Sequence, residues 1–212
     1  MKHVRRIFVG VSLVAVVGAV GIGSVMAKTV APPAPKPARG AAPWLSPADP
    51  LRLTLAAGLR PERRETLIHH VHSHLDVFVN GVRVIVPAGI GINIHDPGVK
   101  KFKEPDGSTA YGGIQLCDKP CISPLHTHGD DGILHTESAS AVPNRLGQFF
   151  TEWGVRLSRA CVGGYCRPDS IQIFVNGKRF TNDPRTILLT DHKEIAVVIG
   201  TQPKTIPGKA GF

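Results

Sequence analysis

The chain has little methionine and fewer acidic than basic residues. Both methionines, Met1 and Met26, lie in the N-terminal segment, so the rest of the 212-residue chain has no thioether. This excludes methionine-rich copper carriers and blue-copper sites with a methionine ligand. The 25 Lys and Arg residues outnumber 16 Asp and Glu residues, for a formal net charge of +9. This positive charge favours binding to anionic partners, and we expect an anionic cell-envelope surface as the candidate partner.

Several functional signatures are also missing. No Ser-His-Asp motif, phosphate-binding glycine loop or nucleic-acid fold signature occurs, and we expect no nucleic-acid partner. Long helices are excluded because 18 prolines and 23 glycines interrupt the chain. Apolar residues make up 42% of the sequence and charged residues 19%, which permits a packed core and argues against wholesale disorder.

The N-terminal segment has the features of an export signal. A short basic start precedes an uncharged stretch at 7–25, and small residues lead to Ala27. We predict a signal peptide at 1–27 and an exported protein, whether periplasmic, cell-envelope or secreted. The alternative is an uncleaved anchor, since about 20 apolar residues span a bilayer. In that case 7–25 would be the membrane contact.

The remainder divides into a linker and a body. Residues 28–50 hold seven prolines among alanines, which predicts an extended linker. We expect a single β-rich domain at 51–212. Its clearest element is a hairpin turning at Asn80-Gly81, a dipeptide suited to two positive φ angles. This turn sets Val79 opposite Val82 and gives the hairpin one apolar face.

The rest of the body shows weaker patterns. Residues 172–180 match 76–84 at five of nine positions, either by duplication or because two hairpins share the same turn chemistry. We expect a short helix to open near 60–65 and another to run from an N-cap at Asn144 to Trp153. Residues 187–189 and 195–199 read as a final strand pair. The predicted fold is mainly β, a sandwich or barrel built from hairpins with one or two short helices.

The four cysteines are expected to be structural. They lie at 117, 121, 161 and 166, and an even count in an exported protein favours disulfides, with three connectivities open. The alternative is a thiolate metal site at Cys117 and Cys121, whose spacing also occurs in copper-delivery proteins.

The histidines carry the strongest functional signal. Eight of the ten fall between His69 and His135. If a hairpin turns at Asp131-Gly132, His128 faces His135 and His126 faces Glu137, all on one side of the pair. Opposed Cβ atoms lie about 4.5–5.5 Å apart, close enough for several imidazoles to share one ion. The predicted metal ligands are His126, His128, His135 and Glu137.

A second histidine group precedes the first hairpin. His72 and His74 share a strand face with Asp76 and Phe78, opposite the apolar side. We include both as candidate ligands and give less weight to His69 and His70. Imidazoles with one carboxylate suit zinc or copper(II), with iron as a further candidate.

Four runs together resemble a family of exported, mostly uncharacterised bacterial and archaeal proteins. They are residues 74–81, 87–92, His126-Thr-His128 with Gly132-Ile-Leu-His135-Thr-Glu137-Ser138, and Leu146-Gly-Gln-Phe-Phe-Thr-Glu-Trp-Gly154. The resemblance covers about 69–200 and implies no established activity. The H-x-H followed by another His and a Glu is also similar to the cupin metal motif. However, Glu137 lies further along the chain than that motif places it, so the likeness is one of architecture only.

Three functions fit these features. The first is an exported domain that holds a divalent transition metal through a His-rich hairpin. The second is a metal-dependent hydrolase or oxygenase at the same site, with Glu137 or Asp130 as the base. The third is a metal-free structural domain of the cell surface, and the sequence does not decide whether the protein is an enzyme.

Overall fold

The fold was analysed in a computed structural model that describes residues 42–166 and 170–212. The predicted signal peptide at 1–27, the stretch at 7–25 and most of the predicted linker lie outside these residues. Within the described ranges, no helix has the length and apolar character needed to cross a membrane.

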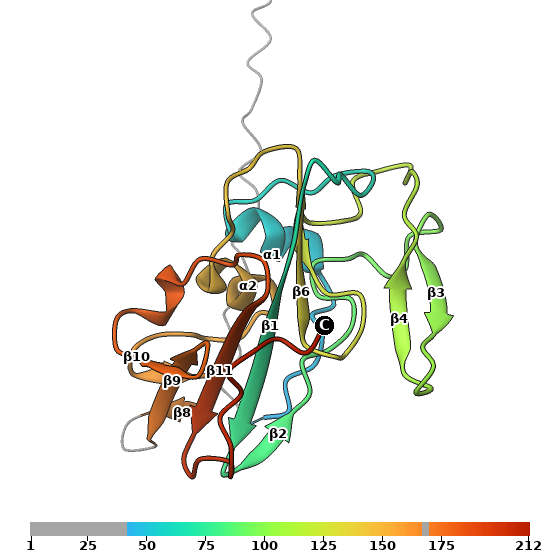
Figure 1. The fold of residues 1–212 in the computed structure, drawn as a ribbon. Helices are drawn as coiled ribbons and strands as arrows, with labels where there is room; N and C mark the ends of the chain where they lie inside the picture. The colour runs from blue at the N-terminus through green and yellow to red at the C-terminus, as the bar shows by residue number, and fades with distance from the viewer. Residues whose placement is uncertain (1–41, 167–169) are drawn as a thin grey trace, which may run out of the picture. The chain divides into compact units, whose positions relative to one another are not determined.

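A seven-stranded mixed sheet forms the centre of the body (Figure 1). Its order is β10-β9-β11-β1-β6-β5, and β2 also pairs with β1. The strands are β1 (His69–Val79), β2 (Val82–Val84), β5 (Leu125–His126), β6 (Ile133–Ser138), β9 (Ile171–Val175), β10 (Lys178–Phe180) and β11 (Lys193–Ile199). The long strand β1 runs parallel to β11 and antiparallel to β6 and β2.

Short helices and two small sheets complete the described part of the body. The helices are α1 (Pro50–Ala56), α2 (Leu146–Glu152) and the 3-10 helix η1 (Pro184–Thr186). The small sheets pair β3 (Lys100–Lys103) with β4 (Thr109–Gly112), and β7 (Cys161–Val162) with β8 (Tyr165–Cys166). The prediction of a mainly-β fold with short helices is confirmed.

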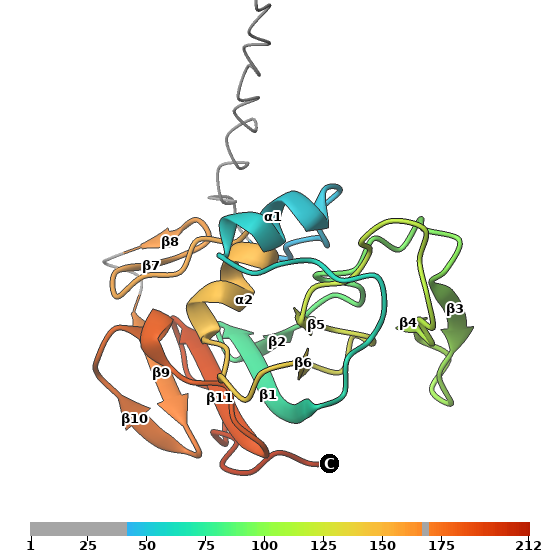
Figure 2. The ribbon, with the colours of Figure 1, turned by 90° about the horizontal axis from the view of Figure 1, so that it is seen from above.

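The main core lies between the sheet and the helices. Figure 2 shows α1 and α2 on one face of the sheet. On that face Leu75 and Val77 of β1 pack with Phe149 and Trp153 around α2. Trp44 belongs to the same core and is 5% exposed, so packing begins upstream of the residue 51 at which we placed the body.

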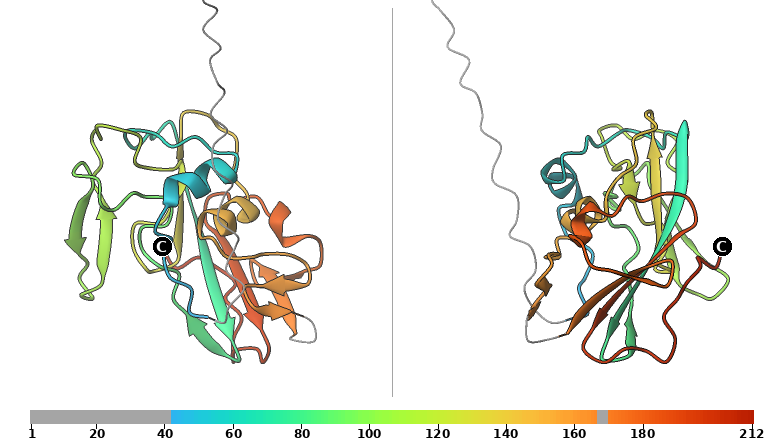
Figure 3. Two further views of the ribbon diagram at one scale, coloured as in Figure 1. Left: turned by 180° about the vertical axis from the view of Figure 1, so that it is seen from behind. Right: turned by 60° about the vertical axis from the view of Figure 1, so that its left-hand side comes forward.

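The opposite face of the sheet has a different character. Because side chains alternate along a strand, the neighbours of Leu75 and Val77 point away from the helices. Phe78 packs there with Phe174 and Val198, beneath Ile206 of the C-terminal segment. Figure 3 shows the C-terminus on the side of the sheet away from α1 and α2. This second face carries His70, His72 and His74 of β1.

The two Asn-Gly turns form as predicted. Asn80 and Gly81 have φ angles of 50° and 80°, and Val79 pairs with Val82 across the turn. Asn176-Gly177 turns the β9–β10 hairpin in the same way, with φ angles of 49° and 74°. Both positions require the left-handed region, which these two residue types adopt at low cost.

Three local predictions are wrong. Residues 187–189 do not pair with 195–199, because β11 lies between β1 and β9. Residues 60–65 form no helix, and Glu62 instead forms a β-bridge with Ile122.

The third error concerns the N-terminus of α2. Arg145 is the N-cap, one residue after the predicted Asn144. The Asn144 side chain instead donates a 3.3 Å hydrogen bond to Thr136 Oγ1 on β6. The amide therefore ties the helix entry to the sheet.

The cysteines form two local disulfides. Cys117 is bonded to Cys121, and Cys161 is bonded to Cys166. The alternative of a thiolate metal site at Cys117 and Cys121 is therefore wrong, because the two sulfurs are bonded to each other. The second disulfide joins the paired strands β7 and β8.

Candidate metal centre

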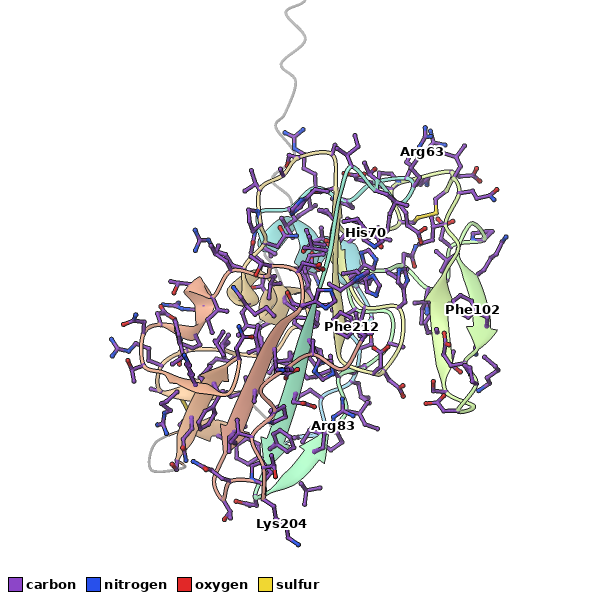
Figure 4. The ribbon with its side chains drawn as sticks, viewed as in Figure 1. Arg63, His70, Arg83, Phe102, Lys204 and Phe212 are labelled. Carbon is purple, nitrogen blue, oxygen red and sulfur yellow. A yellow bond between two sulfur atoms is a disulfide. The ribbon has the colours of Figure 1, made fainter. Side chains whose placement is uncertain are left out.

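Three strands bring the histidines onto the second face of the sheet. The pairing sets His72 of β1 beside His135 of β6, and His135 beside His126 of β5. Directly paired residues point to the same side of a sheet, so these three imidazoles form a row across it. In Figure 4 the labelled His70 lies on β1 near β6, close to this row.

Four of the predicted ligands converge on one point. The donor atoms of the cluster lie within 4.8 Å of one another. His126 is fully buried, Glu137 is 5% exposed, and the other two side chains are partly exposed. The cluster, here called the metal centre, consists of His126, His128, His135 and Glu137.

The predicted strand register is wrong by two residues. His126, and not His128, pairs with His135, and β5 ends there. The chain then leaves the sheet: the Thr127 amide donates to the carbonyl of Ile90, and the His128 carbonyl accepts from the Tyr111 amide. A shift of two residues keeps every side chain on its original face, so the convergence is preserved.

The hydrogen bonds of His126 and His128 fix the orientation of both rings. His126 Nδ1 lies 2.9 Å from the carbonyl oxygen of Ser123, and His128 Nδ1 lies 2.6 Å from that of Tyr111. A carbonyl oxygen only accepts, so each Nδ1 carries a hydrogen and donates it. The two Nε2 atoms face each other at 3.2 Å. Two lone pairs at this distance require a proton or a cation between them.

Glu137 connects the four imidazoles that surround it. Its Oε1 lies 3.4 Å from His135 Nδ1, 3.8 Å from His128 Nε2 and 3.9 Å from His126 Nε2. On the other side it lies 3.3 Å from His70 Nε2. Glu137 Oε2 and His135 Nδ1 are buried, and neither has a hydrogen-bond partner. Polar atoms left in this state are costly unless a ligand satisfies them.

The electrostatics favour the metal-binding form of three of the four ligands. Burial and the neighbouring His128 lower the pKa of His126 well below its ordinary value, so that ring is neutral. Burial also lowers the pKa of His135. Burial would raise the pKa of Glu137, but the imidazoles of His128 and His135 outweigh it and hold that pKa far below the ordinary value. Neutral imidazole and ionised carboxylate are the forms that bind metals. At His128, burial lowers the pKa, but the Glu137 carboxylate and the Tyr111 carbonyl outweigh it and raise that pKa above its ordinary value.

Two glycines give the ligands room. A Cβ on Gly112 would lie 2.9 Å from His128 Nδ1. A Cβ on Gly91 would lie 2.5 Å from the Leu125 carbonyl oxygen and 3.1 Å from His126 Cβ, and Gly91 has a φ angle of +75°. Side chains at these positions would displace the ligands or their supports.

The other predicted site residues are not members of the four-residue metal centre. His72 groups with His70 and His135. His74 groups with Asp76 and Glu194 instead. Asp130 lines surface clefts near the β3–β4 hairpin and is not part of the cluster.

His74 is already satisfied by protein groups. Its Nδ1 lies 2.8 Å from Glu194 Oε2, and its Nε2 lies 3.0 Å from the carbonyl oxygen of Asp131. Although burial lowers the pKa of His74, the Glu194 carboxylate outweighs that effect and raises it. Both ring nitrogens of His74 therefore already have a protein partner.

Sequence reasoning missed the support behind the centre. Ser123 accepts from His126 through its carbonyl, and its Oγ donates to the buried Glu152. It also underweighted His70, which approaches Glu137 only because β1 pairs with β6. The Ser123–Glu152 and His70–Glu137 contacts join segments that are distant in the sequence, so no local pattern reveals them.

No protein-family model, curated protein or solved structure matches this chain. The resemblance to exported bacterial and archaeal proteins therefore stays a prediction. The function is inferred from the residues of the metal centre and their surroundings.

Proposed function

We propose that this is an exported protein that holds a divalent transition-metal ion at the metal centre. The observation that carries the proposal is the 3.2 Å approach of His126 Nε2 to His128 Nε2, with each Nδ1–H donated to a carbonyl. Two ligand bonds of about 2.05 Å at a tetrahedral angle place their nitrogens about 3.3 Å apart. A bound ion therefore fits the spacing that the rings already have.

The remaining donors favour a cation over a shared proton. A proton between His126 and His128 leaves Glu137 Oε2 and His135 Nδ1 unpaired, as they are now. An ion at the common point would engage the Glu137 carboxylate and the third imidazole as well. Metal-binding histidines commonly donate their other N–H to a backbone carbonyl, as His126 and His128 do.

The donor set indicates the class of metal. Three imidazole nitrogens and one carboxylate suit zinc or copper(II), and iron is the next candidate. Two disulfides and the lack of methionine after Met26 argue against a copper(I) carrier. The disulfides also support export, because such bonds persist in oxidising compartments.

Binding is favoured over catalysis at this centre. Four protein ligands complete a tetrahedral shell, whereas catalytic zinc sites keep one position open. The buried side of His126 also leaves little space, because the gap that this residue and Glu137 line with the Glu62–Glu65 segment has no room for a water molecule. We therefore propose a holding role, with the hydrolase or oxygenase and the metal-free surface domain as the alternatives.

Metal analysis of the full chain, purified without chelator, tests the proposal. We expect zinc or copper to remain bound through gel filtration in the wild type and in His95→Ala, an exposed loop variant. The double variant H126A/H128A should lose that ion while keeping its far-UV circular dichroism. A folded wild type that takes up neither metal by titration calorimetry would leave the metal-free surface domain.

A further inference from the structure

Three histidines form a second cluster on the solvent side of the metal centre. The ligand atoms of His70, His72 and His135 lie within 4.8 Å of one another. The rings of His70 and His72 are 4.6 Å apart between centroids, and those of His72 and His135 are 4.5 Å apart. His135 is therefore a member of both clusters.

Strand pairing places the second cluster directly beside the first. β1 and β6 set His70 beside Glu137 and His72 beside His135. The Glu137 carboxylate, whose Oε1 lies 3.3 Å from His70 Nε2, brings negative charge to this side as well. Among the described residues, the His72 ring has no hydrogen-bond partner, so its nitrogens remain available.

The two clusters differ in their access to solvent. The His70 side chain is 36% exposed, whereas His126 in the metal centre is fully buried. Three imidazoles without a fourth protein donor leave coordination positions for water or an external ligand. An ion held by this cluster would exchange with solvent more readily than an ion in the metal centre.

We propose that His70, His72 and His135 hold a second, exchangeable divalent cation, with His135 bridging the two ions. The proposal rests on the proposed function, since the first ion shares His135. An imidazole that binds metals through both nitrogens must lose its ring N–H, so loading the second ion releases one proton from His135 to solvent. The bridge would place the ions about 6 Å apart, given ligand bonds of about 2.0–2.1 Å.

Copper(II) titration of the full chain, followed by electron paramagnetic resonance, tests this arrangement. We expect the wild type and H95A to bind two ions per chain, the second more weakly. Magnetic coupling through the shared imidazole should lower the integrated signal below that of two isolated copper ions. H70A/H72A should bind one ion, a twofold loss, and give the full signal of one isolated copper. Both altered residues are outside the core, and circular dichroism checks that the variant is folded.

The outcomes separate the two proposals. A wild type that saturates at one ion, with H70A/H72A unchanged, overturns the second position and leaves the proposed function intact. Two uncoupled ions in the wild type overturn the bridge. A wild type that binds no copper and no zinc overturns the proposed function and this inference together.

Discussion

Ser123 donates a 2.5 Å hydrogen bond from its Oγ to Glu152 Oε1, in the fully buried region behind the metal centre. The carbonyl of the same serine accepts from His126 Nδ1. Burial raises the pKa of Glu152 to about 8, so this carboxyl is protonated at neutral pH. A neutral acid on α2 thus supports the loop that orients a buried ligand.

Glu152 should make the stability of the metal-free protein depend on pH. Its pKa rises from 4.5 when unfolded to about 8 when folded, so between these values the folded state holds more protons. The free energy of unfolding should therefore fall as pH rises through this window, by at most about 1.4 kcal/mol per pH unit. Glu152→Gln, which cannot ionise, should lose that part of the slope.

Urea unfolding from pH 5 to pH 9, after chelation, measures this effect. The difference between wild type and E152Q removes the contribution of the histidines, which both proteins share. The exposed Asp118→Asn provides a control that should keep the wild-type slope. Equal slopes in E152Q and wild type would show that Glu152 is ionised in the folded protein.

Metal binding should stabilise the fold. Any ligand that binds only the native state adds about 2.7 kcal/mol at a free concentration of 100 times its Kd. We expect zinc to raise the Tm of the chelator-treated wild type, and EDTA to reverse the rise. His135→Ala removes a donor from both clusters and should largely abolish the shift, whereas H95A should keep it. A wild-type Tm that is independent of zinc would contradict a bound metal.

Gly112 should control the affinity of the centre through His128. An added methyl would lie 2.9 Å from His128 Nδ1, so the ring must move away from the Tyr111 carbonyl. Loss of such a support costs about 10–100-fold in metal affinity, which is the decrease we expect for Gly112→Ala. The nearby Gly129→Ala meets Asp131 at 3.6 Å, an ordinary contact, and should bind metal as the wild type does. Competition with a chromophoric chelator gives both values.

The sequence was informative where short-range periodicity decides the outcome. The alternation around Asn80-Gly81 predicted that Leu75 and Val77 face the core, although Val82 across the turn is 69% exposed. The two-residue spacings of the His-rich segment predicted which face its ligands share. The strand register was not accessible in the same way. It depends on two hydrogen bonds that no local pattern reveals: the Thr127 amide donates to the Ile90 carbonyl, and the His128 carbonyl accepts from the Tyr111 amide.

The limits of sequence reasoning are clearest for β1. Besides the adjacent β2, its partners are β11, about 120 residues later, and β6, about 60 residues later. The sequence showed a histidine face on this strand but not its neighbour in the sheet. Because β1 and β6 are adjacent strands, His72 lies side by side with His135.

His72 and His74 were equivalent candidates in the sequence and should behave differently when replaced. His74→Ala removes a partner from Glu194, which is 1% exposed, and should lower the free energy of unfolding by about 1–3 kcal/mol. It should leave the metal content unchanged, because both His74 ring nitrogens already face protein groups. His72→Ala should do the reverse. Its urea midpoint should change little, because the His72 ring has no hydrogen-bond partner among the described residues. The variant should lose the exchangeable ion. Paired unfolding and metal analyses of the two variants check this contrast, and loss of metal in H74A would return His74 to the ligand set.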